Sequence, residues 1–233
     1  DELIIVDQGN KLVQDEPDFP QAEQAMHGKL RMIRQGNMGG SGGFARNMYE
    51  VVRGRDTPNG VEKSDYVLIL DDDILLESEG VLRATAFADM CHTPSIVGGH
   101  MFDMYNKPLL NAYAEVVNPY RFLWGPIDGL GGVDFAERGL RSRPQLHRRW
   151  DADYNGWWMC LIPRVVLEDI GLSLPVFIKW DDSEYSLRAK AAGYPTISLP
   201  GAAVWHVSWA DKDDAVDWQA YFHERNRLIA ALL

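Results

Sequence analysis

The sequence has few cysteines and no long apolar run. Its 233 residues include two cysteines, Cys91 and Cys160, which lie far apart and lack the spacing of a metal motif. We therefore expect reduced core thiols in a cytosolic protein rather than a disulfide framework. No run of apolar residues is long enough to cross a bilayer, and no signal peptide is visible.

Positive charge is also scarce, because 23 lysine and arginine residues face 34 aspartate and glutamate residues, for a net charge of −11. Nucleic acid binding requires a basic surface, so this balance argues against nucleic acid as the main partner. A phosphorylated small molecule is still compatible with the acidic net charge, since a few local groups can bind it. One basic cluster stands out, and it forms either a solvated loop or a surface for a diphosphate or an anionic lipid headgroup: Arg141, Arg143, His147, Arg148 and Arg149.

Strand-like and helix-like segments alternate in the first half of the chain. This alternation predicts an α/β protein with a mostly parallel central sheet and helices on both faces. The predicted strands are 3–6, 30–34, 66–70, 96–99, 111–117, 157–162, 196–199 and 203–205. The predicted helices are 21–27, 44–52, 81–90, 163–170, 183–192 and 214–233, and 121–149 is expected to be irregular. The chain opens directly in a strand and ends inside a helical pattern, so we expect a fragment of a larger protein.

Three aspartates directly follow the predicted strand 66–70. Ligands of parallel sheets bind at the carboxyl ends of strands, which is where Asp71, Asp72 and Asp73 lie. Adjacent carboxylates repel one another, and a divalent cation would remove that cost. Residues i and i+2 of an extended segment point the same way, so Asp71 and Asp73 can converge on one ion. The alternative is a solvated acidic turn that caps the following helix.

A second acidic group follows Trp180 and precedes a predicted helix. Asp181 and Asp182 are favourable at the positive end of a helix as simple caps. Alternatively, one of them is a general base that takes a proton from a sugar hydroxyl. The pair Trp205-His206 is equally open, since a lone histidine after a strand is more often structural. If His206 shares a site with Asp71 and Asp73, the set suits a transition metal such as Mn²⁺.

Two further segments allow a structural and a functional interpretation. The run from Tyr154 to Trp158 carries paired tryptophans, which either pack in the core or offer an aromatic face to a sugar ring. The run from Gly36 to Gly43 predicts a flexible loop that matches neither a P-loop nor the dinucleotide fingerprint. Its glycines permit close approach to a ligand, and the following helix offers amide donors to phosphate.

Taken together, these segments resemble the GT-A glycosyltransferases of family 2, and within them the polymerising UDP-galactofuranosyltransferases of mycobacterial cell-wall galactan synthesis. The resemblance runs from Val6 to about Leu228. Its generic part is the aspartate triplet, and its specific part is a set of tryptophan-rich matches. These are Asp153-Tyr154-Asn155-Gly156-Trp157-Trp158, Phe177-Ile178-Lys179-Trp180-Asp181-Asp182, Leu199-Pro200-Gly201-Ala202-Ala203-Val204-Trp205-His206 and Asp217-Trp218-Gln219-Ala220-Tyr221-Phe222-His223.

The resemblance implies a role for each matching residue. Asp71, Asp73 and His206 would hold Mn²⁺ or Mg²⁺, which grips the diphosphate of the UDP-sugar. Asp182 would be the catalytic base of an inverting transfer, and Asp181 would contact the acceptor. The remaining nucleotide-sugar residues would be Asp7, Asp72, Gly39 and Gly40, and the remaining acceptor residues Trp157, Trp158, Tyr154, Glu115, Trp124 and His223.

The resemblance also implies an α/β/α sandwich in which about 1–100 forms the nucleotide-sugar half and about 101–233 the acceptor half with the C-terminal helix. From the resemblance we also expect that the family's first strand and helix would lie upstream of Asp1, outside this sequence. The implied acceptor is lipid-linked galactan, which suggests a cytoplasmic protein in peripheral contact with the inner face of the plasma membrane; a homo-oligomer stays open. The alternatives are a family 2 transferase for another sugar and a truncated, non-catalytic carbohydrate-binding fragment.

Overall fold

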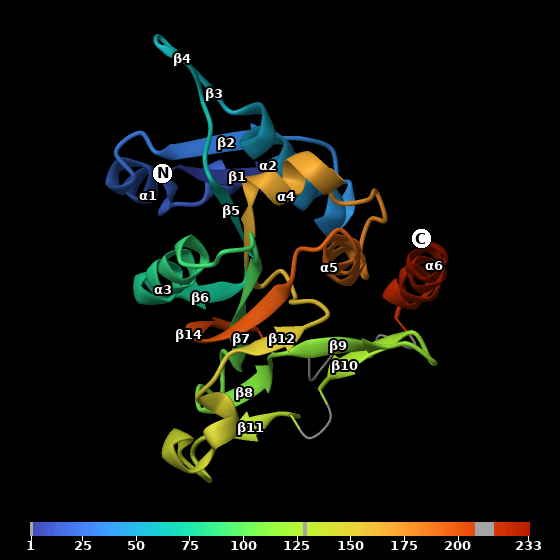
Figure 1. Cartoon of the computed structure of the whole chain (residues 1–233). Coiled ribbons are helices and arrows are strands. Elements are labelled where there is room, and N and C mark those ends of the chain that lie inside the picture. Colours follow the sequence, from blue (N-terminus) through green and yellow to red (C-terminus); the bar gives the residue numbers. More distant parts are fainter. Residues whose placement is uncertain (1, 128–129, 208–216) are drawn as a thin grey trace.

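The computed structural model describes residues 2–127, 130–207 and 217–233 (Figure 1). Its first unit is a two-stranded parallel sheet of β1 (Leu3–Asp7) and β2 (Leu30–Arg34). Between these strands lie a short 3₁₀ turn (Val13–Asp15) and helix α1 (Phe19–Ala25). Helix α2 (Gly39–Arg53) packs against both β1 and β5, so it joins this small sheet to the larger one.

The larger sheet has eight strands, in the path β11-β8-β7-β13-β5 with β14, β6 and β12 beside it. Strands β5, β7 and β14 run in the same direction, because β13 pairs antiparallel with both β5 and β7 while β14 pairs parallel with β7. The strands are β5 (Tyr66–Leu70), β6 (Ile74–Leu76), β7 (Ile96–Asp103), β8 (Leu109–Ala112), β11 (Val133–Asp134), β12 (Trp150–Ala152), β13 (Met159–Pro163) and β14 (Thr196–His206). Two hairpins stand apart, β3 (Arg55–Thr57) with β4 (Gly60–Glu62) and β9 (Glu115–Asn118) with β10 (Leu123–Pro126).

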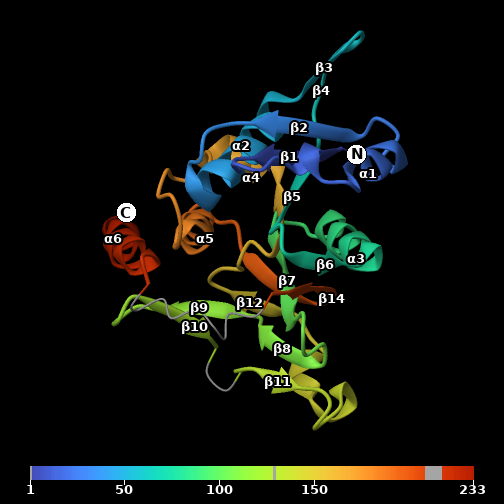
Figure 2. The same cartoon turned by 180° about the vertical axis from the view of Figure 1, so that it is seen from behind.

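Helices cover both faces of this sheet, as Figure 2 shows from behind. Alternate residues of β13 point to opposite faces. Cys160 and Ile162 pack in the cluster that includes α2, α4 (Arg164–Ile170) and α5 (Asp181–Ala191). Met159 and Leu161 pack in the cluster that includes α3 (Ser78–Asp89). The predicted α/β class with helices on both faces is therefore confirmed.

Several local predictions were wrong. The larger sheet is mixed rather than mostly parallel, because the strand predicted at 157–162 enters between two others in the reverse direction. The strand predicted at 111–117 is two strands, divided where Ala114 has a φ of 51°. The strands predicted at 196–199 and 203–205 are one strand with a register shift between Ser198 and Ala203.

Other departures concern the ends and the loops. The segment 121–149 contains β10, β11 and two 3₁₀ turns (Leu140–Ser142 and Pro144–Leu146) rather than only irregular chain. The last helix, α6 (Gln219–Leu232), starts later than predicted, and residues 214–216 of that prediction lie outside the described residues. Both cysteines are free, with Cys160 buried in the core and Cys91 half-buried. Among the described helices, none has the length and apolar character needed to cross a membrane.

A buried carboxylate ties α2 to the small sheet. Glu50 is 3% exposed, and it accepts bonds from Arg31 on β2 at 2.7 Å and from Arg46 on α2 at 2.8 Å. Burial alone would raise the pKa of Glu50, but the two guanidinium groups outweigh it and the pKa is lowered. Ionised Glu50 therefore favours the folded state.

We expect Glu50→Gln to lower the free energy of unfolding by roughly 1.5–3 kcal/mol at pH 7, the usual worth of hydrogen bonds to a charged group. A lowered folded pKa contributes stability above the ordinary glutamate value of 4.5 and loses it as the pH falls through the folded pKa. Urea unfolding measures the free energy of unfolding of wild type and variant at each pH. The difference between the two should shrink as the pH falls below 4.5. A gap that stayed constant down to acid unfolding would contradict this account.

Candidate active site

Three predicted residues come together at one edge of the larger sheet. Asp71 and Asp73 follow β5, and His206 ends β14, which runs in the same direction as β5. The His206 Nε2 atom lies 3.3 Å from Asp71 Oδ2 and 3.0 Å from Asp73 Oδ1. The potential ligand atoms of all three residues lie within 4.8 Å of one another. The predicted convergence of these residues is confirmed.

The chemistry of this group fits a divalent cation. The Nδ1 atom of His206 lies 2.6 Å from the carbonyl oxygen of Val207, so Nδ1 carries the proton and donates it. The Nε2 atom then faces the two carboxylates. A ring nitrogen that donates to a backbone carbonyl while the other faces the ion is the usual arrangement of metal-bound histidine. Asp72 is exposed between its two neighbours and is not part of this group.

The second acidic pair opens α5 near the same edge. Asp181 and Asp182 are the first two residues of α5, and the carboxylate of Asp182 accepts a bond from the amide of Ser183 at 2.6 Å. Burial raises the pKa of both residues, the charge of Asp182 raises that of Asp181 further, and the charge of Asp71 raises both. The two carboxylates therefore lie at the positive end of α5, as the capping interpretation predicts. The charge of Asp71 in the metal group acts on both of them.

The glycine run is not a flexible loop, since Gly39–Gly43 forms the first turn of α2. Gly39 has a φ of 71°, and a Cβ built on it would lie 2.0 Å from the carbonyl oxygen of Phe177. A Cβ on Gly40 would lie 3.8 Å from a carboxylate oxygen of Asp181. These glycines let α2 pack against the turn that precedes α5, and the nucleotide-sugar contacts of Gly39 and Gly40 stay predictions.

Asp7 ends β1 and is 7% exposed. Its two carboxylate oxygens accept backbone amides, from Gly9 at 2.8 Å and from Val13 at 3.0 Å. The bond from Val13 is the largest of the effects that lower the pKa of Asp7. Asp7 therefore shapes the loop after β1, and its contact with uridine stays a prediction.

Of the predicted acceptor residues, Glu115 and Tyr154 lie near Asp182, and Trp124 and His223 adjoin Trp180 just before the acidic pair. Glu115 and Tyr154 bridge in antiparallel fashion, and the charge of Asp182 acts on both. Burial is the main cause that raises the pKa of Glu115 to about 7. Trp124 stacks on His223 with ring centroids 4.4 Å apart, and both adjoin Trp180.

Trp157 and Trp158 are each 4% exposed and belong to the two core clusters on opposite faces of the sheet. Trp158 donates its indole N–H to the carbonyl of Gly99 at 2.8 Å, and Trp157 packs edge-on against Phe44. Packing is therefore their observed role, and a contact with the acceptor stays a prediction. Sequence reasoning missed Trp180 itself, which is 1% exposed and donates to His223 Nδ1 at 2.8 Å.

The basic cluster lies apart from this site, on the lobe of two 3₁₀ turns at the bottom of Figure 1. Arg148 stacks on Trp150 at 4.0 Å, and Arg149 pairs with Asp151 at 3.4 Å. Both ion-pair partners are at least half exposed, so the pair is worth little to stability. The solvated-loop interpretation accounts for these contacts.

This geometry can be compared with known proteins. A family model described as glycosyltransferase-like family 2 matches residues 2–231. The chain belongs to this family. Two curated relatives are galactofuranosyltransferases GlfT2, from Mycobacterium tuberculosis (47% identical over 236 residues) and Mycolicibacterium smegmatis (44% identical over 237 residues). The alignments cover 99% of this family 2 chain but 36% of each relative, so the chain spans about a third of their length.

Solved structures with low sequence identity share the fold. GalNAc-T7, solved with UDP, GalNAc and Mn²⁺, matches with a TM-score of 0.66 at 11% identity, over 99% of this chain and 41% of its own. The mannosyltransferase PcManGT from Pyrobaculum calidifontis, solved with GDP-Man and Mn²⁺, matches with a TM-score of 0.60 at 14% identity, over 99% and 55%. The predicted GT-A fold is confirmed by these neighbours.

The glycine run offers a matched pair of substitutions. We expect Gly39→Ala to destabilise the chain by about 2–5 kcal/mol, because it adds left-handed strain to an overlap with the Phe177 carbonyl. Gly36→Ala is the control, since nothing lies within 4 Å of a Cβ built there. Thermal unfolding of both variants makes the measurement. Equal melting temperatures would mean that α2 and the Phe177 turn do not pack as described.

Proposed function

We propose that this chain is the catalytic part of an inverting galactofuranosyltransferase, which transfers galactofuranose from UDP-galactofuranose to a growing lipid-linked cell-wall galactan. The observation that carries the proposal is the sequence identity of 47% and 44% to two enzymes named galactofuranosyltransferase. Its second support is the set of carboxylates and imidazole at the sheet edge, which has the composition that such a reaction needs.

Asp71, Asp73 and His206 would hold the cation, Mn²⁺ or Mg²⁺. When bound, the ion supplies positive charge that stabilises the diphosphate of the leaving UDP. Two carboxylates and one imidazole suit Mn²⁺ better than a set of oxygens alone would, and two solved neighbours of the same fold carry Mn²⁺. Asp7, Asp72, Gly39 and Gly40 would contribute to the nucleotide-sugar side.

Asp182 would be the general base. A base works best when its pKa lies near the working pH, and both burial and the charge of Asp71 raise the pKa of Asp182. It takes a proton from the acceptor hydroxyl, whose oxygen attacks the anomeric carbon from the face opposite UDP. One displacement of this kind inverts the configuration and needs no covalent intermediate. Asp181 would bind a neighbouring acceptor hydroxyl.

Aromatic and acidic side chains beside Asp182 would form the acceptor site. The charge of Asp182 acts on Glu115 and Tyr154, and Trp124 and His223 pack against Trp180, which directly precedes the two aspartates. Trp157 and Trp158 would contribute to the acceptor site by packing in the core beside it. A lipid-linked acceptor would bring the enzyme to the inner face of the plasma membrane as a peripheral protein.

The second candidate is another family 2 transferase that uses a different nucleotide sugar, because family membership and fold leave the sugar open. The third, a non-catalytic carbohydrate-binding fragment, is disfavoured because both acidic pairs are intact. The donor test uses the intact enzyme with a lipid-linked galactan primer and Mn²⁺. Transfer from UDP-galactofuranose and none from UDP-glucose supports the proposal, and equal turnover of both supports the second candidate.

Two substitutions separate the roles of the carboxylates. Asp182→Asn should lower kcat by about 10²–10⁴-fold, the range of general base catalysis, while Mn²⁺-dependent UDP binding persists. Asp73→Asn should weaken that binding instead, since it removes a charged ligand from the metal group. Calorimetric titration with UDP and Mn²⁺ gives the binding readout. Loss of UDP binding in Asp182→Asn would place Asp182 in the metal site and overturn its role as base.

A further inference from the structure

The turn that precedes the acidic pair is strained. Phe177, Lys179 and Trp180 have φ values of 75°, 67° and 70°, although none of them is glycine or asparagine. Bulky side chains in this region are rare outliers that carry backbone strain. Trp180 caps α5, so the path of this turn sets the direction in which Asp181 and Asp182 leave it. A strained turn at this place persists only if its surroundings hold it.

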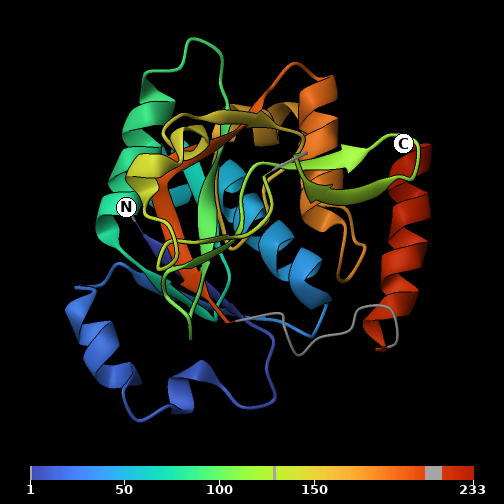
Figure 3. The same cartoon turned by 90° about the horizontal axis from the view of Figure 1, so that it is seen from below.

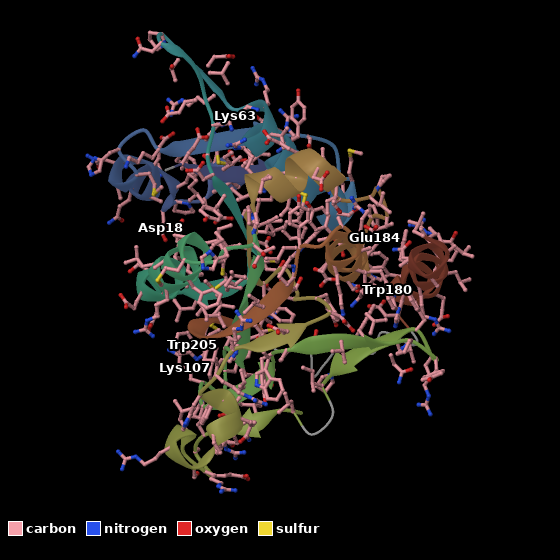
Figure 4. The ribbon with its side chains drawn as sticks, in the orientation of Figure 1. Asp18, Lys63, Lys107, Trp180, Glu184 and Trp205 are labelled. Carbon is pink, nitrogen blue, oxygen red and sulfur yellow. The ribbon has the colours of Figure 1, made fainter. Side chains whose placement is uncertain are left out.

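One buried side chain from α6 holds the carbonyl oxygens of the turn. Asn226 is 1% exposed, and its Nδ2 atom lies 3.0 Å from the oxygen of Val176, 2.7 Å from that of Ile178 and 2.9 Å from that of Lys179. A primary amide has two hydrogens, so these contacts are shared. Figure 4, in the orientation of Figure 1, shows Trp180 between α5 and α6.

The orientation of the Asn226 amide is itself fixed. Arg225 Nε donates to Asn226 Oδ1 at 2.8 Å, and a guanidinium can only donate, so the oxygen faces Arg225 and the nitrogen faces the turn. The Nη2 atom of Arg225 donates to the same turn, at 2.5 Å from the carbonyl oxygen of Val176. The two residues therefore act as one donor set, placed 48 residues beyond the turn they hold.

The opposite side of the turn is held by α2. The amide of Ser41 donates to the oxygen of Phe177 at 3.1 Å, and the amide of Phe177 donates to Ser41 Oγ at 2.9 Å. Ser41 is fully buried. Figure 3, seen from below, shows α5 between the blue α2 and the red α6. The turn thus has fixed contacts on two helices that come from opposite ends of the chain.

We propose that Asn226 is a positioning residue for catalysis: it clamps the left-handed turn 176–180 and so fixes where the carboxylates of Asp181 and Asp182 lie. This inference rests on the proposed function for the role of Asp182, but the clamp itself is a property of the fold. Asn226 touches no reacting atom. Removing it releases the turn to relax out of its left-handed conformation, which moves the base and leaves the metal group on β5 and β14 in place.

Kinetics of the intact enzyme make the first test. Asn226→Ala should lower kcat by about 10–100-fold, because a shift of about 1 Å in a catalytic group has that effect. The KM for the donor and the Mn²⁺ dependence should change less than about twofold, since no proposed donor or metal residue belongs to the turn 176–180. Leu228→Ala is the matched control on the same helix, where Leu228 is 61% exposed. A rise in donor KM equal to the fall in kcat would overturn the proposal.

A double-mutant cycle distinguishes the clamp from a general contribution to folding. Glycine adopts a positive φ without strain, so Lys179→Gly reduces the need for a clamp. The loss of kcat caused by Asn226→Ala should be several-fold smaller in the Lys179→Gly background than in the wild type. If Asn226 only stabilises the protein, the two losses are equal, and that result overturns the proposal.

Hydrogen exchange tests the clamp without any assay of transfer. In Asn226→Ala the amides of Ser41 and Phe177 should exchange faster, because both bonds depend on the shape of the turn. The amide of Gly171, which donates to Leu167 at the end of α4, should keep its rate. Unchanged exchange at Ser41 and Phe177 overturns the clamp. Faster exchange there, in an enzyme that transfers no galactofuranose, supports the clamp and rejects the proposed function alone.

Discussion

Repulsion between carboxylates is the constraint on which the rest of this structure depends. Asp71 and Asp73 leave β5 toward the same edge of the sheet at which Asp181 and Asp182 open α5, and Glu115 lies within the field of the latter. Such a concentration of like charge is costly in a chain that already carries a net charge of −11. It is tolerable where a cation joins the group, where amides at a helix start face the carboxylates, and where some of the acids take up protons near neutral pH.

The carboxylates of the metal group and of the acidic pair must also be held in fixed positions relative to each other. The metal group is fixed by two strands that run the same way. The acidic pair is fixed less directly, by a turn that no single element could hold. Helix α2 meets that turn through Ser41, and it also receives the side chain of Gln8, which donates to the carbonyl of Gly39 at 2.9 Å. The end of β1 and the start of α5 are therefore connected through the first turn of one helix.

Much of this could be predicted from sequence. A triplet of aspartates after a buried strand predicts a ligand edge, and the structure brings His206 to it. The direction of β13 could not be predicted, because a run of buried residues reads the same both ways. The glycines of α2 predict a loop when only local propensity is considered, whereas Gly39 is needed for its contact with Phe177. The left-handed turn contains no glycine, so its positive φ values could not be predicted from the sequence. Its partner Asn226 is also distant in sequence.

The separation of the β1–β2 sheet from the eight-stranded sheet has a practical consequence. Among the described strands, β1 pairs only with β2, and β5 pairs only with β13, so each has one edge without a hydrogen-bonded neighbour. Open edges of this kind are templates on which another extended segment can form a ladder. At high protein concentration the nearest such segment belongs to another molecule. Strand addition between copies is therefore a route by which this chain can associate in solution.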